Sequence, residues 1–217
     1  MAKQFLVIGA GRFGSSVART LYDLGHDVMV VDSDDALVQE ISDYVTHAVQ
    51  ADASSEPALR AMGIRDFDCV IVAIGQDVQT SIMACILLIE MGARYIVAKA
   101  QTELHGKVLR KLGVNRVVFP ERDMGQKLAH NLSSKNIIDF IELSSDCSVV
   151  EVSTPEKMVG KTLQELNLRA KYGINVIAIR NENGRTNIAP GADDRLNPKD
   201  VIVAIGANKN LREMGWI

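Results

Sequence analysis

The sequence predicts an α/β fold, with a Rossmann-like, doubly wound parallel sheet followed by a small α+β lobe. Short apolar, β-branched runs alternate with helical patterns over residues 4–119. Uninterrupted apolar strands of this kind are typical of a parallel sheet that helices cover on both faces. A glycine-rich segment, VIGAGRFGSS at 7–16, joins the first apolar run to the first helical pattern. Dinucleotide-binding folds carry their phosphate-binding turn at this place.

The elements of the first lobe follow one another in strict alternation. Strands are expected at the β-branched runs and helices at the segments between them. In chain order, the expected strands are residues 5–9, 27–32, 47–51, 68–74, 95–98 and 116–119, and the expected helices are 12–24, 35–43, 55–62, 77–91 and 102–112. Six strand–helix steps in this order predict the doubly wound sheet.

The pattern changes after Phe119-Pro120. Residues 121–143 are predicted to be helical, with a break at 133–136. The apolar positions of this segment are Met124, Leu128, Leu132, Ile137, Ile138, Phe140 and Ile141. They either close the first domain or cross over to a second subunit and form a dimer interface, because an amphipathic stripe does not identify what it packs against. The expected division is an N-lobe at 1–119, a crossover and dimerisation segment at 120–144, and a C-lobe at 145–217.

The last part of the chain predicts a small α+β unit. Strands are expected at 148–152, 175–180, 186–188 and 201–204, with a short helix near 162–166. The sequence NENG at 181–184 is typical of a hairpin turn, and NPKD at 197–200 predicts a second turn.

Composition excludes several classes of protein. The net charge is −3 and aromatic residues make up 5% of the chain, which disfavours nucleic-acid binding. Cys69, Cys85 and Cys147 lack metal-binding spacing and are expected to be structural thiols in a reducing compartment. We expect a cytoplasmic protein, because no apolar run is long enough to span a bilayer and the N-terminus lacks the pattern of a signal peptide.

The glycine turn is expected to bind a nucleotide. Gly9 allows the tight turn, Gly11 lets the backbone approach phosphates, and Gly14 allows close packing of helix and strand. The N–H groups at the start of the following helix then face the anion. Arg12, inside the turn, is unfavourable for the helix dipole unless it meets a ligand with more charge than a dinucleotide, such as ADP or ATP. A solvated surface arginine is the alternative.

Aspartates end the next two strands. Asp32 is expected to accept hydrogen bonds from ribose hydroxyls, which favours NAD over NADP. The alternative role, capping the helix that begins near 35, can be filled by Asp34 instead. Asp52 lies either at the adenine rim or at a helix cap. The small residues Ala73-Ile74-Gly75, after the fourth strand, suit either close approach to a nucleotide or a plain turn.

Catalytic machinery is missing from the sequence. His26, His47, His105 and His130 lie in no recognisable catalytic setting and are expected to be satisfied or solvated. No nucleophile elbow, P-loop or zinc motif is present. A nucleotide-binding chain without such machinery indicates sensing rather than turnover, although a small NAD-dependent oxidoreductase stays the rival hypothesis.

Several segments resemble the RCK (regulator of potassium conductance) family, in particular the KtrA/TrkA-type cytosolic subunits of potassium transporters. The run FPERDMG at 119–125 is far more specific than the glycine motif. The resemblance covers nearly the whole chain and is carried by residues 7–16, VVD at 30–32, ADASSEPALRAMGI at 51–64, VIVAIGQDVQTS at 70–81, VAKAQTELHGKVLRKLGVNRVVFPERDMG at 97–125 and LNLRAKYGINVIAI at 166–179.

The resemblance implies an N-lobe that binds ATP or ADP, with NAD or NADH as the alternative of TrkA-type regulators. Arg12 would then meet the outer phosphates, either in its own subunit or across a dimer. Glu121 and its symmetry mate would hold Mg²⁺ or Ca²⁺ between two nucleotides, because a divalent cation offsets the repulsion of their phosphates. From the residues alone, Lys99 is a strand-end lysine and Glu121 a first-turn acid. The implied nucleotide-binding residues are Gly9, Gly11, Arg12, Phe13, Gly14, Asp32, Ser33, Asp52, Ala53, Ala73, Ile74, Gly75, Lys99 and Glu121.

The resemblance also implies a second ligand, cyclic di-AMP, at a C-lobe dimer interface. Arg169 is suited to pair with a phosphate, but a surface ion pair explains it equally well. Dimers would assemble into an octameric ring beneath a membrane potassium transporter subunit of the KtrB or TrkH type, at the inner face of the plasma membrane. The implied cyclic di-AMP residues are Leu168, Arg169, Ala170, Asn175, Ile177 and Pro190.

Overall fold

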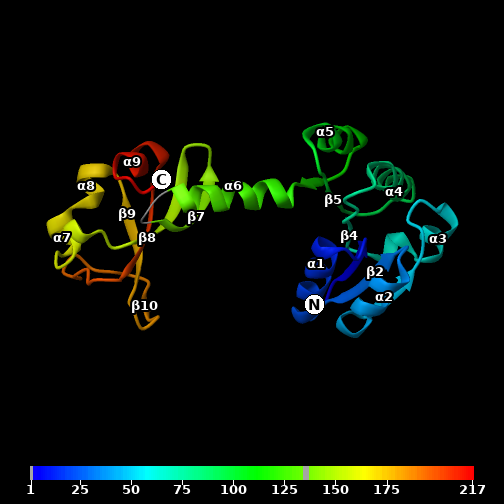
Figure 1. Cartoon of the computed structure of the whole chain (residues 1–217), viewed down its shortest axis with the longest axis horizontal. Coiled ribbons are helices and arrows are strands. Elements are labelled where there is room, and N and C mark those ends of the chain that lie inside the picture. Colours follow the sequence, from blue (N-terminus) through cyan, green and yellow to red (C-terminus); the bar gives the residue numbers. More distant parts are fainter. Residues whose placement is uncertain (1, 134–136) are drawn as a thin grey trace. The chain divides into compact units, whose positions relative to one another are not determined.

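The computed structural model describes residues 2–133 and 137–217. The chain divides after Arg122 into two compact units, each with its own sheet and core (Figure 1). Within the described residues, no helix has the length and apolar character needed to cross a membrane.

The first unit contains a six-stranded parallel sheet in the order β3-β2-β1-β4-β5-β6. This order confirms the predicted doubly wound fold, because the direction of winding reverses between β1 and β4. The strands are β1 Gln4–Ile8, β2 Asp27–Asp32, β3 His47–Gln50, β4 Cys69–Val72, β5 Ile96–Lys99 and β6 Arg116–Val118. The helices are α1 Arg12–Asp23, α2 Asp35–Ile41, α3 Glu56–Ala61, α4 Val78–Glu90 and α5 Glu103–Leu112, with 3₁₀ turns at Ser42–Tyr44 and Ile64–Asp66.

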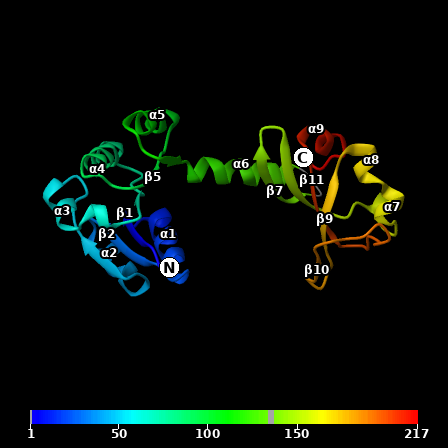
Figure 2. The same cartoon turned by 180° about the vertical axis from the view of Figure 1, so that it is seen from behind.

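Both faces of this sheet are buried. Along β1, Leu6 and Ile8 belong to one apolar cluster and Val7 belongs to another. Successive side chains of a strand point to opposite faces, so the two clusters lie on the two sides of the sheet. The helices around the strands are visible in Figure 2.

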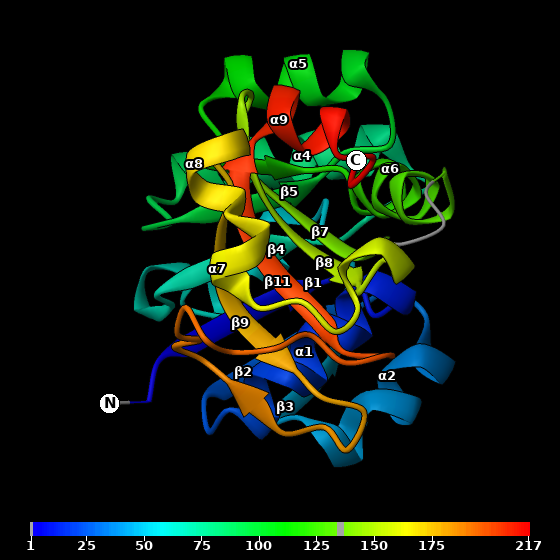
Figure 3. The same ribbon diagram turned by 90° about the vertical axis from the view of Figure 1, so that its left-hand side faces the viewer.

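The second unit contains a five-stranded sheet in the order β10-β9-β11-β8-β7, all antiparallel. Buried Val150, Val152, Ile202 and Trp216 contribute to its core. Figure 3 looks onto this unit, with α7 and α8 (yellow) in front of its strands. The strands are β7 Ile137–Ser144, β8 Cys147–Ser153, β9 Asn175–Arg180, β10 Thr186–Asn187 and β11 Val201–Ala207, and the helices are α7 Leu163–Leu166, α8 Leu168–Tyr172 and α9 Asn208–Glu213, with a 3₁₀ turn at Glu156–Met158.

The segment between the lobes corrects one prediction. Helix α6 spans Pro120–Ser133, but Ile137–Ser144 forms strand β7, so the expected helix over 121–143 is wrong from Ile137 onward. Here β-branched residues favour a strand, and β7 pairs with β8 as a hairpin in which Ile141 faces Val149. Residues 134–136 of the expected break lie outside the described residues.

Both predicted turns of the second unit are confirmed. In the NENG turn, the N–H of Asn181 donates to the carbonyl of Arg185 at 2.9 Å, and Gly184 takes a φ of +79°. Glycine adopts such a positive φ without steric cost. In the NPKD turn, the N–H of Asp200 donates to the carbonyl of Asn197 at 3.3 Å.

Candidate functional site

The residues predicted to bind a nucleotide lie at one edge of the parallel sheet, where its strands end at their carboxyl termini. Ligands of open α/β sheets bind at this edge, near the point where the winding reverses. Gly9, Gly11, Arg12, Phe13 and Gly14 follow β1; Asp32 ends β2 and Ser33 follows it; Asp52 and Ala53 follow β3; Ala73, Ile74 and Gly75 follow β4; Lys99 ends β5; and Glu121 lies in the first turn of α6, after β6.

The glycine turn packs tightly against the ends of β2 and β4. The N–H of Gly9 donates to the carbonyl of Val31, and the N–H of Ala73 donates to the carbonyl of Ile8, both at 2.7 Å. A Cβ added to Gly14 would lie 1.8 Å from the carbonyl oxygen of Gly9. A Cβ added to Gly11 would meet no atom within 4 Å. Gly14 is therefore required for packing, whereas Gly11 leaves space in which a ligand can approach the backbone.

Helix α1 begins without a side-chain cap. Its N-cap residue is Gly11, which makes no capping hydrogen bond, and its first turn contains no acidic residue. The first N–H groups of a helix have no partner within the helix and carry partial positive charge. Exposed Arg12 adds a full positive charge at the same place. This end of α1 is suited to an anion such as a phosphate.

Asp32 ties the glycine turn to the end of β2. Its Oδ2 accepts from the N–H of Ala10 at 2.6 Å, and its Oδ1 accepts from the N–H of Asp34 at 2.9 Å. The cap of α2 is Asp34, whose carboxylate accepts from the N–H of Ala36, so the alternative role of Asp32 as a helix cap is wrong. A carboxylate offers about four acceptor positions, which leaves Asp32 able to accept from ribose hydroxyls.

Asp52 organises the turn after β3. The N–H and the hydroxyl of Ser54 both donate to its Oδ1, at 2.8 and 2.7 Å. The hydrogen bond from the Ser54 N–H is the main cause that lowers the pKa of Asp52 below its ordinary value of 3.8. The N-cap of α3 is Ser55, so Asp52 does not cap that helix. Ala53 is buried in the core.

Lys99 and Glu121 form an ion pair at the end of β5. Lys99 Nζ lies 2.5 Å from Glu121 Oε1 and 5.8 Å from the centre of the Phe13 ring. The hydrogen bond from Lys99 is the main cause that lowers the pKa of Glu121 below its ordinary value of 4.5, and the charge of Arg12 contributes to it. The start of α1 and the end of β5 therefore place the positive charges of Arg12 and Lys99 near the Glu121 carboxylate, which lies after β6.

Gln101 is a polar residue at this edge that the sequence analysis did not predict. A Cβ added to Gly75 would lie 3.3 Å from Lys99 Nζ and 3.8 Å from Gln101 Nε2. The Lys99 ammonium and the Gln101 amide therefore both border the turn after β4. The position of Gln101, two residues after the end of β5, is the signal that would have included it.

Comparison with known proteins places this chain in a family. Residues 5–120 match the family model of the TrkA-N domain, and residues 147–215 match that of the TrkA-C domain. The chain belongs to the TrkA family of potassium uptake proteins. It is 42% identical over 207 residues to Ktr system potassium uptake protein C of Bacillus subtilis (strain 168), which covers 95% of this chain and 93% of that protein. It is 41% identical over 210 residues to Ktr system potassium uptake protein A of the same organism, covering 97% and 94% of the two chains.

Solved structures confirm the RCK fold of this TrkA-family chain. The GsuK RCK domain superposes with a TM-score of 0.71 at 19% identity, covering 100% of this chain and 47% of that one. The GsuK channel bound to NAD gives a TM-score of 0.69 at 18% identity, with coverage of 97% and 38%. GsuK bound to ADP gives a TM-score of 0.54 at 18% identity, with coverage of 60% and 35%.

The cyclic di-AMP candidates lie in the TrkA-C domain. Leu168, Arg169 and Ala170 are on α8, Asn175 and Ile177 are on β9, and Pro190 is in the loop before β11. The N–H of Ile174 donates to the carbonyl of Leu168, which holds the start of β9 next to α8. Leu168 is buried in the core, whereas Arg169, Ala170, Asn175 and Ile177 are exposed. The hydrogen bonds among the described residues do not join Pro190 to the other five.

Two open surface pockets lie away from these candidate residues. In the TrkA-N domain, a cavity of about 400 Å³ includes Gln4, Asp27 and His47, which begin β1, β2 and β3. It is therefore at the edge opposite the glycine turn. In the TrkA-C domain, a cavity of about 290 Å³ lies between the β9–β10 hairpin and residues 194–200 and contains none of the six candidates.

Glu121 is the residue predicted to bind a metal ion, and its surroundings show how well a cation fits there. Among the described residues, no group of three or more histidine, cysteine, aspartate or glutamate side chains is arranged to hold a metal. Glu121 offers one carboxylate, with 69% of its side chain exposed. Hard divalent cations need several oxygen ligands, so the remaining oxygens of such a site would come from bound phosphates and a second subunit.

The histidines of the TrkA-N domain differ in burial and in hydrogen bonding. His26 accepts from the N–H of Lys3 at 3.4 Å, and His47 is exposed. His105 is 3% exposed, and neither ring nitrogen has a hydrogen-bond partner among the described residues. The expectation that His105 is satisfied or solvated is therefore wrong, because the first turn of α5 packs it into the interior. The side chain of His130 lies outside the described residues.

Proposed function

We propose that this chain is the nucleotide-gated cytosolic subunit of a potassium uptake system. It binds ATP or ADP at the carboxyl edge of the TrkA-N sheet and thereby controls a membrane transporter subunit. The observation that carries the proposal is the gathering of Arg12, Lys99 and Glu121 at the uncapped start of α1. The names of the Ktr relatives support the role in potassium uptake.

The nucleotide is proposed to lie across the reversal point between β1 and β4. Asp32 binds the ribose, the N–H groups at the start of α1 bind phosphate, and Ser33, Asp52 and Ala53 lie near the adenine. Phe13 and the turn at 73–75 border the phosphates. Arg12 and Lys99 supply positive charge beyond what a pyrophosphate needs, which favours ADP or ATP over NAD. Arg12 reaches the outer phosphates of its own subunit or of a dimer partner.

Glu121 is the proposed protein ligand of Mg²⁺ or Ca²⁺ at the dimer interface. When bound, the cation offsets the repulsion between the phosphates of two nucleotides. Lys99 already pairs with Glu121, so a phosphate would compete with Glu121 for Lys99, and the cation would compete with Lys99 for Glu121. This competition makes the position of Glu121 sensitive to the ligand.

The proposal also assigns a separate function to each segment of the chain. Residues 1–119 bind the nucleotide, 120–144 cross over to a partner, and 145–217 carry the cyclic di-AMP site with Arg169 as its phosphate-binding residue. Met124, Leu128 and Leu132 of α6 are 64%, 55% and 77% exposed. Such an apolar stripe supports a subunit interface, through which dimers assemble into an octameric ring.

Gating requires no chemical step. A ligand shifts a conformational equilibrium only by the difference in its affinity for the two states. We therefore propose a non-enzymatic protein in which ATP and ADP favour different ring shapes. Its partner is a membrane subunit of the KtrB or TrkH type, and its location is the inner face of the plasma membrane.

A TrkA-type sensor of NAD(H) is the second candidate, and Asp32 favours it because a carboxylate at this position suits NAD. The NAD-bound GsuK channel supports the same alternative. A small NAD-dependent oxidoreductase is the third. A panel of hydroxy-acid and alcohol substrates distinguishes it, because any hydride transfer to NAD⁺ above background would overturn the non-enzymatic proposal.

Light scattering of the full chain tests the regulatory assembly. We expect a dimer or larger ring whose size or shape differs between ATP and ADP. A monomer at all concentrations, with and without nucleotide, would contradict the proposed function.

A further inference from the structure

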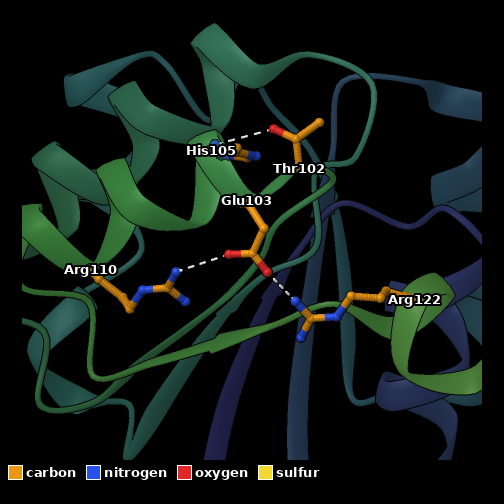
Figure 4. Close-up of polar contacts among 5 residues, drawn as sticks. All are labelled: Thr102, Glu103, His105, Arg110 and Arg122. Atoms are coloured by element: carbon orange, nitrogen blue, oxygen red, sulfur yellow. Dashed lines mark hydrogen bonds and ion pairs between the residues drawn. The ribbon is translucent and has the colours of Figure 1, made fainter. Parts of the chain in front are cut away.

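Arg122 and Glu103 join the start of α6 to α5. Glu103 accepts from Arg110 Nη2 at 3.3 Å and also from Arg122 Nη1. Figure 4 shows the Glu103 carboxylate between the two guanidinium groups, with Arg110 on α5 and Arg122 on α6. Glu103 is in the first turn of α5, where negative charge is favourable.

Phe119 makes the second contact between these elements. The guanidinium carbon of Arg122 lies 3.9 Å from the centre of the Phe119 ring. A Cβ added to Gly106 would lie 2.4 Å from Phe119 Cζ, so the ring packs directly on the backbone of α5. We call Glu103, Gly106, Phe119 and Arg122 the α6 clamp.

Glu121 lies between two members of the clamp in sequence but engages a different element. It pairs with Lys99 at the end of β5, whereas Arg122 pairs with Glu103 on α5. Successive helix residues point about 100° apart. The two ion pairs therefore hold the first turn of α6 on two different sides.

We propose that Arg122 is a positioning residue for Glu121: the α6 clamp fixes the first turn of α6 so that the Glu121 carboxylate stays at the nucleotide site. This inference rests on the proposed function, because it concerns the group through which that site would sense its ligand. Arg122 pairs with Glu103 and packs on Phe119, and we propose that it acts on Glu121 through the helix backbone. Arg110 shares the same carboxylate but belongs to α5, which makes it the matched control.

The first test needs no ligand. Carbon-13 NMR follows the titration of the Glu121 carboxyl in the full chain and in the Arg122→Gln and Arg110→Gln variants. The hydrogen bond from Lys99 is the main cause that lowers the pKa of Glu121, so moving Glu121 away from Lys99 would raise that pKa. We expect the pKa to return toward 4.5 in Arg122→Gln and to stay low in Arg110→Gln. An unchanged titration in Arg122→Gln would overturn the proposal.

The second test uses ATP titrated with and without Mg²⁺. We expect Arg122→Gln to reduce the gain in ATP affinity from Mg²⁺ by about three- to fivefold, the scale of a partly exposed ion pair. The charge-reversed double variant Glu103→Arg with Arg122→Glu restores the gain, and Arg122→Glu alone does not. Equal losses with and without Mg²⁺, or no restoration in the double variant, would show a folding role and reject positioning.

The two tests separate this inference from the function on which it rests. If the unaltered chain binds no ATP but Arg122→Gln shifts the titration of Glu121, the proposed function fails and the clamp stands. If ATP and Mg²⁺ bind as expected but Arg122→Gln changes neither readout, the clamp fails and the proposed function stands.

Discussion

Lys99 Nζ and Glu121 Oε1 lie 2.5 Å apart and join the end of β5 to the first turn of α6. Lys99 is only 9% exposed, whereas 69% of the Glu121 side chain is exposed. A buried cation depends on its partner for stabilisation, so the exposed carboxylate is the replaceable half of the pair. A ligand phosphate can take its place.

Replacing Glu121 by Gln should reduce stability only modestly, by about 1 kcal/mol or less, because water screens an exposed acid. The folded pKa of Glu121 lies below 4.5. Its contribution is therefore present above that value and is lost as the pH falls through the folded pKa. Urea unfolding at a series of pH values from 7 downward should show a difference between the two proteins that shrinks as the pH falls below 4.5. A difference that does not shrink at any acidic pH would show that the ion pair is not its source.

Substitutions at Gly14 and Gly11 distinguish the role of the glycine turn in packing from its role in nucleotide binding. Gly14→Ala places a Cβ 1.8 Å from the Gly9 carbonyl oxygen and should cost about 3 kcal/mol of unfolding free energy, as overpacking does. Gly11→Ala meets no atom within 4 Å, so it should cost no more than about 1 kcal/mol. Gly11→Ala should nevertheless weaken ATP binding on the order of tenfold, because the second glycine admits phosphate to the backbone. Thermal unfolding and ATP titration check both variants, and full ATP affinity in Gly11→Ala would reject the glycine turn as the phosphate site.

Asp32 and Asp34 make a second matched pair. Asp32→Ala leaves the N–H of buried Ala10 without its acceptor, which costs about 1–3 kcal/mol. Asp34→Ala removes the cap of α2 and costs about 1 kcal/mol. Only Asp32→Ala should also weaken nucleotide binding, which titration of both variants measures. Equal affinities in the two variants would exclude Asp32 from ribose binding.

His105 should make stability depend on pH. Burial lowers the pKa of His105 below its ordinary value of 6.5. The unfolded chain therefore binds the proton more readily, and stability should fall as the pH decreases from about 7 toward 5, by at most about 1.4 kcal/mol per pH unit. His105→Leu should remove this slope, whereas the same substitution at exposed His47 should keep it. Parallel slopes in the unaltered chain and in His105→Leu would contradict the assignment.

The sequence predicted those features of the site that short motifs determine. The glycine turn and Asp32 follow from local spacing, because Gly9 and Gly14 each meet a backbone requirement of one strand–helix turn. The meeting of Lys99 with Glu121 could not be predicted from the residues alone. Each residue is explained on its own as a surface charge, and only the order of β5 and β6 in the sheet brings them together.

Tertiary pairing also explains the largest error in the predicted fold. The apolar positions of 137–141 continue the helical spacing of α6, so the sequence pattern predicts a helix where the structure has a strand. Pairing with β8, which places Phe140 opposite Val150, decides the conformation in favour of β7. His105 was misjudged for a related reason, since its helix exposes its neighbours Leu104 and Lys107 while burying the histidine itself.

Calorimetric titration of the full chain with ATP, ADP, NAD⁺ and NADH, each with and without Mg²⁺, tests the central claim most directly. Arg12→Ala and Glu121→Gln are measured in parallel. The account predicts that ATP and ADP bind more tightly than either dinucleotide, that Arg12→Ala weakens ATP binding, and that Glu121→Gln removes the gain from Mg²⁺. Tighter binding of NADH, with neither substitution altering it, would contradict the account and favour an NAD(H) sensor.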